Sequence, residues 1–252
     1  MKGPRREKVY IYGKNALVEA LHHAPHVLRK VFLAPEMHDA RIIGLLEANK
    51  IPSALLGREE AASVVGRDTS HQGVIAVMDP AALMVPFERF MQTLDLSKHP
   101  AVVILGEVQD PHNVGAIIRS AAAFGIAGVL IPEHNQSPVT GTVVKTSAGM
   151  AFRIPLVGIG NVNNTIRVLK EKGFWVYGLA MQGARALREE AFDAPAVFVV
   201  GNEGAGIREK TLEACDVLLK IPMHERTESL NAAVSASVVF YEWSSRHPES
   251  LA

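Results

Sequence analysis

The feature that most constrains the fold of this 252-residue chain is a strand pattern near its C-terminus that ends in a glycine-rich loop. Four apolar residues at 197–200 stop at Gly201, and the loop GNEGAG follows at 201–206. An apolar, β-branched run of this kind indicates a buried strand whose carboxyl end opens into a turn. In open α/β sheets ligands bind at such carboxyl ends. The sequence therefore predicts a ligand site around Gly201.

A second segment repeats the pattern. Residues 217–221 are expected as a strand, residues 222–228 as a loop, and a helix is expected from about Asn231. Ser229 and Asn231 stand at the start of that helix, where backbone N–H groups are free and short polar side chains are favoured. An ordinary helix start explains both residues equally well. Together with the first loop, they predict one site for a polar ligand.

Strands and helices alternate through the rest of the chain. Apolar runs at 101–108, 128–132, 154–159 and 174–180 read as strands, and helices are expected at 116–125 and 161–172. This alternation predicts an α/β fold with a mostly parallel sheet and helices on both faces. The first 80 residues alternate too, as a smaller α/β unit. We expect domains at 1–80 and 100–252, joined by a linker at 81–99.

Composition excludes several classes of protein. No apolar run reaches about 18 residues, so no membrane span is expected. The basic N-terminus MKGPRREK lacks a following apolar region and is not read as a secretory signal. Cys215 is the only cysteine, which favours a cytoplasmic setting.

Charge and histidine content narrow the possible ligands. The formal net charge is zero, so contacts with nucleic acid would use local patches such as Arg5, Arg6 and Lys8. A cluster of histidines at residues 22–26 has no acid or cysteine at ligand spacing, so a solvated or capping role is expected and no metal site.

The segment 106–125, GEVQDPHNVGAIIRSAAAFG, holds two candidate site residues. Asn113 is placed to cap the helix that follows, and capping alone would explain it. Arg119 is the only charged residue between Val114 and Gly128, and small residues lie one turn to either side of it. Its guanidinium is thus uncrowded and suited to a planar anion such as a phosphate. Exposure to bulk solvent is the alternative.

The loop GNEGAG holds a third candidate, Glu203. The loop is rich in glycine but lacks the GxGxxG spacing and the Lys-Ser/Thr of a P-loop. Taken alone it is weak evidence for phosphate binding, and Glu203 is equally consistent with an exposed turn.

Taken jointly, three blocks resemble the SpoU (TrmH) family of RNA ribose 2′-O-methyltransferases, within the SPOUT superfamily. The blocks are DPHNVGAIIRSAAAFG, FVVGNEGAGI and IPM…SLN, and the resemblance covers 100–245. The N-terminal unit, with GKNALVEAL and HQGVIA, is similar to the small, ribosomal-protein-like α/β domain that binds substrate in the large-subunit rRNA guanosine methyltransferases.

The resemblance implies S-adenosylmethionine held in a deep C-terminal trefoil knot, by loops around Leu179, Gly201, Ile221 and Leu230. It implies a homodimer in which Arg119 of the partner subunit reaches the site. It also implies a catalytic set made up of Asn113, Arg119, Glu203, Ser229 and Asn231.

Substrate identity is the open question. Between IPM and SLN the family has small residues, whereas this chain has the charged run HERTE at 224–228. Ribosomal RNA is the expected substrate and transfer RNA the alternative. A non-catalytic RNA-binding assembly factor is a further alternative. A nucleotide-dependent oxidoreductase is disfavoured, because no GxGxxG follows the first strand of the 100–252 domain.

Overall fold

The computed structural model describes residues 8–66, 70–180 and 185–252, so Arg5 and Arg6 lie outside the described residues. The chain divides into two compact units. The first comprises Met1–Met84 with Val139–Arg153, and the second comprises Val85–Pro138 with Ile154–Ala252. The chain therefore passes between the units three times.

The first unit is built on a four-stranded sheet in the order β1-β4-β2-β3. Strand β4 is antiparallel to β1 and β2, whereas β2 and β3 are parallel. The elements of this unit are β1 (Val9–Tyr12), α1 (Lys14–His23), β2 (Leu28–Leu33), α2 (Ala40–Ala48), β3 (Ser53–Leu55), α3 (Arg58–Val65), β4 (Val74–Met78) and α6 (Gly141–Thr146).

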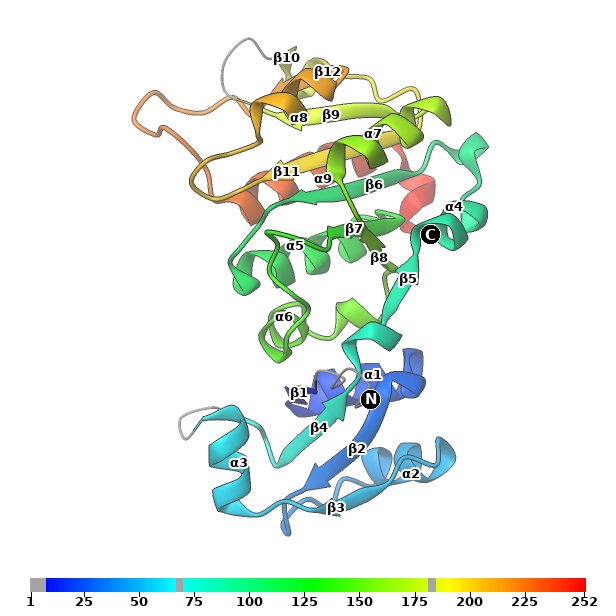
Figure 1. Ribbon diagram of the computed structural model, residues 1–252, viewed down its shortest axis with the longest axis vertical. Helices are drawn as coiled ribbons and strands as arrows, with labels where there is room; N and C mark the ends of the chain where they lie inside the picture. Colours follow the sequence, from blue (N-terminus) through cyan, green and yellow to red (C-terminus); the bar gives the residue numbers. More distant parts are fainter. Residues whose placement is uncertain (1–7, 67–69, 181–184) are drawn as a thin grey trace, which may run out of the picture. The chain divides into compact units, whose positions relative to one another are not determined.

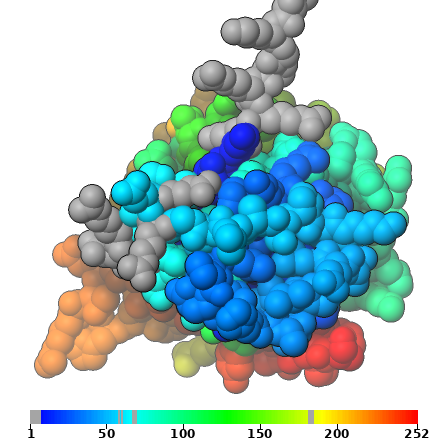
Figure 2. All heavy atoms as spheres, turned by 90° about the horizontal axis from the view of Figure 1, so that it is seen from below, coloured from blue at the N-terminus to red at the C-terminus, as the bar shows by residue number. Residues whose placement is uncertain are grey.

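The first unit has its own core. Helix α1 buries Leu17 and Leu21, and the neighbouring α2 buries Ile42 and Leu46. A separate apolar cluster includes Leu56, Ala61 and Ile75. The described residues of this unit up to Met84, blue to cyan in Figure 2, lie next to one another on the face shown there.

The second unit is built on an eight-stranded sheet in the order β10-β12-β9-β11-β6-β7-β8-β5. Strands β12, β9, β11, β6, β7 and β8 pair in parallel. The elements are β5 (Met84–Pro86), α4 (Phe87–Thr93), β6 (Ala101–Gly106), α5 (Pro111–Ala123), β7 (Gly128–Pro132), β8 (Leu156–Ile159), α7 (Val162–Glu171), β9 (Trp175–Leu179), β10 (Arg185–Ala186), β11 (Ala196–Gly201), α8 (Glu209–Ala214), β12 (Val217–Lys220) and α9 (Ala232–Arg246).

Helices cover both faces of this sheet (Figure 1). Successive side chains of a strand point to opposite faces. Along β11, Val197 and Val199 join an apolar cluster with Ile166 of α7. Phe198 packs instead against Phe240 of α9, with ring centroids 6.0 Å apart. The predicted α/β architecture with a mostly parallel sheet is confirmed.

The structure differs from the sequence-based expectation at several segments. The short strands β1 and β5 were not expected, and residues 81–99, expected as a linker, contribute β5 and α4 to the second unit. The Thr/Ser/Gly-rich segment after β7 packs with the first unit. Its Gly141 lies so close to the carbonyl oxygen of Tyr10 that a Cβ would overlap that oxygen.

Helix α5 begins earlier than the expected residue 116. Asp110 caps the helix by accepting a 2.8 Å hydrogen bond from the His112 N–H, and Pro111 occupies the first helical position, which its fixed φ favours. The expectation that Asn113 caps this helix is therefore wrong. Asn113 lies inside the first turn, so its side chain is available for other contacts.

The described residues contain no helix long and apolar enough to cross a membrane. In the same residues, no three His, Cys, Asp or Glu side chains gather in a way that could hold a metal ion.

The packing of the second unit can be tested by a substitution at Gly128. A Cβ at Gly128 would come within 2.5 Å of the ring of Phe90, which is 2% exposed and cannot turn away. We expect Gly128→Ala to lower the free energy of unfolding by about 1–3 kcal/mol through overpacking. Gly160→Ala is the control, because nothing lies within 4 Å of its added Cβ. Urea titration followed by tryptophan fluorescence reports on this unit, which holds both tryptophans. Equal stability of the two variants would contradict the packing described here.

Candidate functional site

A cavity of about 540 Å³ lies at the carboxyl ends of β9, β11 and β12 in the second unit. Leu179 and Gly201 reach it from the ends of β9 and β11, and Ile221 and Leu230 reach it from the loop that precedes α9. All four residues expected to bind cofactor therefore lie around one cavity. Their meeting follows from the parallel sheet, which brings the carboxyl ends of neighbouring strands to one edge.

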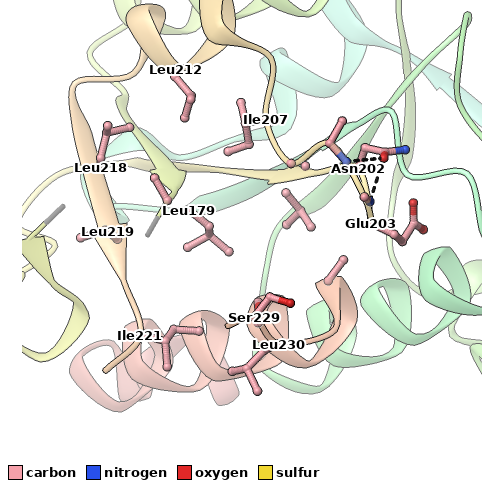
Figure 3. A pocket seen from close by; sticks show the side chains of 18 of the residues that line it. Leu179, Asn202, Glu203, Ile207, Leu212, Leu218, Leu219, Ile221, Ser229 and Leu230 are labelled. Carbon is pink, nitrogen blue, oxygen red and sulfur yellow. Dashed lines mark hydrogen bonds between the residues drawn. The ribbon is translucent and has the colours of Figure 1, made fainter. Parts of the chain in front are cut away.

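The cavity has an apolar side and a polar end (Figure 3). Apolar side chains from α8, β12 and the loops around them gather on one side, and the sequence analysis had not singled them out: Ile207, Leu212, Leu218 and Leu219. Asn202 and Glu203 stand at the opposite end. The only signal for the apolar wall was the apolar character of 217–221. Such a cavity suits a ligand with one apolar and one polar part.

The carboxylate of Glu203 joins two loops at the polar end. Its two oxygens accept hydrogen bonds from the backbone N–H groups of Gln109, at 3.2 Å, and Asp110, at 3.1 Å. The side-chain amide of Asn113 donates a third, at 3.0 Å. Glu203 thus connects the loop after β11 with the loop after β6.

This chain of hydrogen bonds continues to the start of α9. The Asn231 side-chain amide donates to Oδ1 of Asn113 at 2.9 Å, while Oδ1 of Asn231 accepts from the N–H groups of Ala233 and Val234 as the helix cap. Asn113 therefore links Glu203 to Asn231. Asn113 lies 90 positions from Glu203 and 118 positions from Asn231 in the sequence, yet the three side chains form one polar array.

The array holds Glu203 in its ionised form. Partial burial of the carboxyl group by itself raises the pKa of Glu203. The hydrogen bonds from Asn113 and from the backbone N–H groups outweigh burial, so the pKa is lowered from its ordinary value. A carboxylate that accepts several N–H groups is a fixed negative charge at the mouth of the cavity.

Asn202 is a site residue that the sequence analysis missed. Its Oδ1 accepts hydrogen bonds from the N–H groups of Gly204 at 2.9 Å and Ala205 at 3.0 Å, which closes the loop on itself. Asn and Asp commonly form turns of this kind, so the residue type at 202 was a signal that could have been used.

Arg119 stands apart from the cavity. It lies on α5, exposed, and does not line the cavity wall. Among the residues that the structure describes, no hydrogen-bond or ion-pair partner for its guanidinium is found. Asn113 and Arg119 both lie on α5, but their surroundings differ. Asn113 is buried in the polar array, whereas Arg119 faces solvent.

The charged run at 224–228 also faces solvent. All five residues are exposed, and the loop projects away from the sheet (Figure 1, orange). Met223 and Ser229, which flank the run, line the cavity. The charged run 224–228, which stands where the family has small residues, is therefore not part of the cavity wall.

Cys215 is packed rather than reactive. Its thiol donates to the carbonyl of Thr211 at 3.2 Å, and burial, with a contribution from the charge of Asp216, raises the pKa of Cys215 to about 12. A thiol with this pKa is not a nucleophile at neutral pH.

Comparison with solved structures supports this fold. The SpoU methyltransferase AviRb from Streptomyces viridochromogenes, in complex with the cofactor AdoMet, superposes with a TM-score of 0.81. The match covers 96% of this chain and 91% of that chain at 22% identity. An AdoMet-bound rRNA methyltransferase from Sinorhizobium meliloti superposes with a TM-score of 0.79, over 95% and 87% of the two chains at 22% identity. At these identities the comparison establishes the fold.

Comparison of sequences gives relatives of similar length. The 23S rRNA (guanosine-2′-O-)-methyltransferase RlmB of Xanthomonas campestris is 36% identical over 239 residues, which is 94% of this chain and 96% of the relative. The enzyme of the same name from Neisseria meningitidis is 34% identical over 92% of this chain and 93% of the relative.

Family models match both parts of the chain. Residues 100–241 match the SpoU rRNA Methylase family, which is more than half of the chain. Residues 10–84 match the RNA 2′-O ribose methyltransferase substrate binding family. The fold, the cavity at the strand ends and these matches agree with the resemblance seen in the three sequence blocks. The chain belongs to the SpoU rRNA methylase family and is an RNA 2′-O-ribose methyltransferase.

Proposed function

We propose that this protein methylates the ribose 2′-hydroxyl of a guanosine in 23S ribosomal RNA, with S-adenosylmethionine as methyl donor. The observation that carries the proposal is the polar array of Glu203, Asn113 and Asn231 at the mouth of the cavity. Relatives that are named for this reaction align with nearly the whole chain. A protein with this substrate works in the cytoplasm.

The cavity suits the proposed cofactor. Its apolar wall fits an adenine ring, and its polar end fits groups that form hydrogen bonds. A Cβ at Gly201 would overlap the carbonyl carbon of Gly206 and lie 2.5 Å from the Ile207 nitrogen, so only glycine allows the loop to fold back beside the cavity. We assign the cofactor contacts to Leu179, Gly201, Ile221 and Leu230, in loops that we infer to form a trefoil knot.

The side chains of the array orient the reacting groups. When bound, S-adenosylmethionine supplies an electrophilic methyl group on a positively charged sulfur, and the reaction is proposed without a metal ion. Asn113, Glu203, Ser229 and Asn231 position the ribose, and this positioning supplies much of the rate.

Arg119 has a different role. Its guanidinium stays protonated, so it acts as a clamp on the neighbouring phosphate and stabilises the developing alkoxide instead of serving as a free base, and the hydroxyl proton passes to solvent water.

We further propose that Arg119 acts on the cavity of a partner subunit. Its exposed position on α5, the helix that packs against α9, is explained if the α5–α9 face is a homodimer interface. This face carries two large exposed apolar side chains, Val234 at 48% and Tyr241 at 60% exposure. Tyr241 packs edge-on against Phe124, which directly follows α5, with ring centroids 5.9 Å apart. A partner subunit on this face would cover apolar surface.

The substrate is tested by transfer of labelled methyl groups to RNA that lacks the modification. We expect label on the 2′-oxygen of a guanosine in large-subunit rRNA, located by mapping of the labelled fragment. Label on transfer RNA would retain the chemistry and replace the substrate. Tight binding of S-adenosylhomocysteine without transfer to any RNA would favour a non-catalytic assembly factor.

The cofactor site is tested with two glycines of one loop. We expect Gly201→Ala to weaken binding of S-adenosylhomocysteine by about a hundredfold or more, because the added methyl group displaces the backbone at 206–207. In Gly204→Ala the nearest atom to the added Cβ is Asn202 Oδ1, at 3.7 Å, so binding should stay within about twofold of wild type. Calorimetric titration measures both. If the two variants bound S-adenosylhomocysteine equally well, the assignment of a cofactor contact to this loop would be wrong.

Action of Arg119 in trans is tested by complementation. Arg119→Ala and Asn231→Ala homodimers should each lose methyl transfer. In a mixed dimer, one composite site would carry both substitutions and the other would carry neither. We expect mixed dimers to recover about half of the wild-type turnover. If Arg119 served its own subunit, each site would keep one defect and turnover would not recover. A monomer in light scattering would also reject the dimer.

A further inference from the structure

The two loops that meet at Glu203 are joined by a second set of contacts, centred on Glu107. In the paired strands β6 and β11, Gly106 and Gly201 are the last register partners. Glu107 and Asn202 follow them directly, and the Asn202 side-chain amide donates to the Glu107 carbonyl oxygen at 3.0 Å. The same Asn202 side chain closes its own loop through Gly204 and Ala205. One carboxamide therefore fixes both loops.

The side chain of Glu107 is held as well. Arg208, which precedes α8, donates a hydrogen bond from Nε to Glu107 Oε2 at 2.9 Å, and its Nη2 lies 2.8 Å from the same oxygen as an ion pair. Charge-assisted hydrogen bonds of this length are the strong ones. Glu107 is thus held at its carbonyl by one loop residue and at its carboxylate by another.

The backbone of Glu107 is in an unusual conformation. Its φ is +69°, in the left-handed region that glycine adopts at the lowest cost and that other residues rarely adopt. Residues held in this region concentrate at functional sites, where the surrounding contacts keep them in place. Here those contacts are the ones made by Asn202 and Arg208.

The conformation of Glu107 sets the direction of the backbone that follows. Two and three residues later, the N–H groups of Gln109 and Asp110 point at the Glu203 carboxylate. The Arg208 side chain is 67% exposed, and exposed ion pairs contribute little to the stability of a protein. A contribution to stability therefore does not explain why this ion pair is present. A role in orienting the backbone after Glu107 does explain it.

We propose that Glu107 is a positioning residue for methyl transfer. Arg208 and Asn202 hold Glu107 in place. Glu107 in turn directs the N–H groups of Gln109 and Asp110 at Glu203. This inference rests on the proposed function for its effect on the reaction. Its effect on the two backbone N–H groups does not depend on that function.

The variants to compare are Glu107→Gln, Arg208→Gln and the double variant. Each single variant removes one charge of the pair, and the double variant removes both. Arg208→Lys keeps the positive charge and should recover part of the loss. Arg167→Gln is the matched control, because Arg167 forms an equally short 2.8 Å ion pair with Glu171 and is also 67% exposed, but lies on α7.

Two measurements are made on each variant. Hydrogen exchange, read by NMR without cofactor or RNA, should be about tenfold faster at the Gln109 and Asp110 amides in Glu107→Gln and Arg208→Gln, and unchanged in the control. The kcat for methyl transfer should fall about tenfold in both, with the KM for RNA and the melting temperature nearly unchanged. The double variant should be no slower than the slower single variant, because the two residues act as a unit.

Wild-type exchange at both amides in the Gln variants would overturn the proposal. So would faster exchange with unchanged kcat in an active enzyme. If the wild-type protein transfers no methyl group to RNA, the proposed function fails. The exchange rates then still decide whether Glu107 positions the two amides.

Discussion

The carboxylate of Glu203 is the interaction on which the rest of the site depends. It accepts two backbone N–H groups from the loop after β6 and one side-chain amide from the first turn of α5. Without an acceptor there, the side-chain amide of Asn113, which is buried, would lose its partner, and this costs more than the bond itself contributes. Because the donors also lower the pKa of Glu203, the carboxylate stays charged where the ribose and the sulfonium are proposed to meet.

The strand-end cavity was predictable from sequence because each of its parts has a local signal. An apolar run that stops at Gly201, and a second run that ends before Pro222, both indicate carboxyl ends of parallel strands, and such ends share one edge. Asn231 as a helix start follows from residue type, and the structure confirms it as the cap of α9. The pairing of Asn113 with Glu203 and Asn231 was not predictable from spacing, since it joins residues about 90 and 118 positions apart.

Other features failed because tertiary contacts override local pattern. Asn113 is a residue type that often caps helices, but Asp110 caps α5 three residues earlier and Pro111 is its first residue. β1 and β5 are four and three residues long, too short for a periodic signal, and are defined by their neighbours in the sheet. Glu107 carried no sequence signal, because a positive φ at a glutamate is set by Asn202 and Arg208, both about a hundred residues away.

The three passages of the chain between the two units have a consequence for modularity. The segment Val139–Arg153 lies within the span that matches the methylase family, yet it packs with the N-terminal unit, where Gly141 adjoins Tyr10 and Arg153 pairs with Glu19. A recombination event at a single junction near residue 84 would separate this segment from its packing partners. An exchange of N-terminal units between relatives preserves these contacts only if the segment 139–153 is exchanged together with the unit that it packs against.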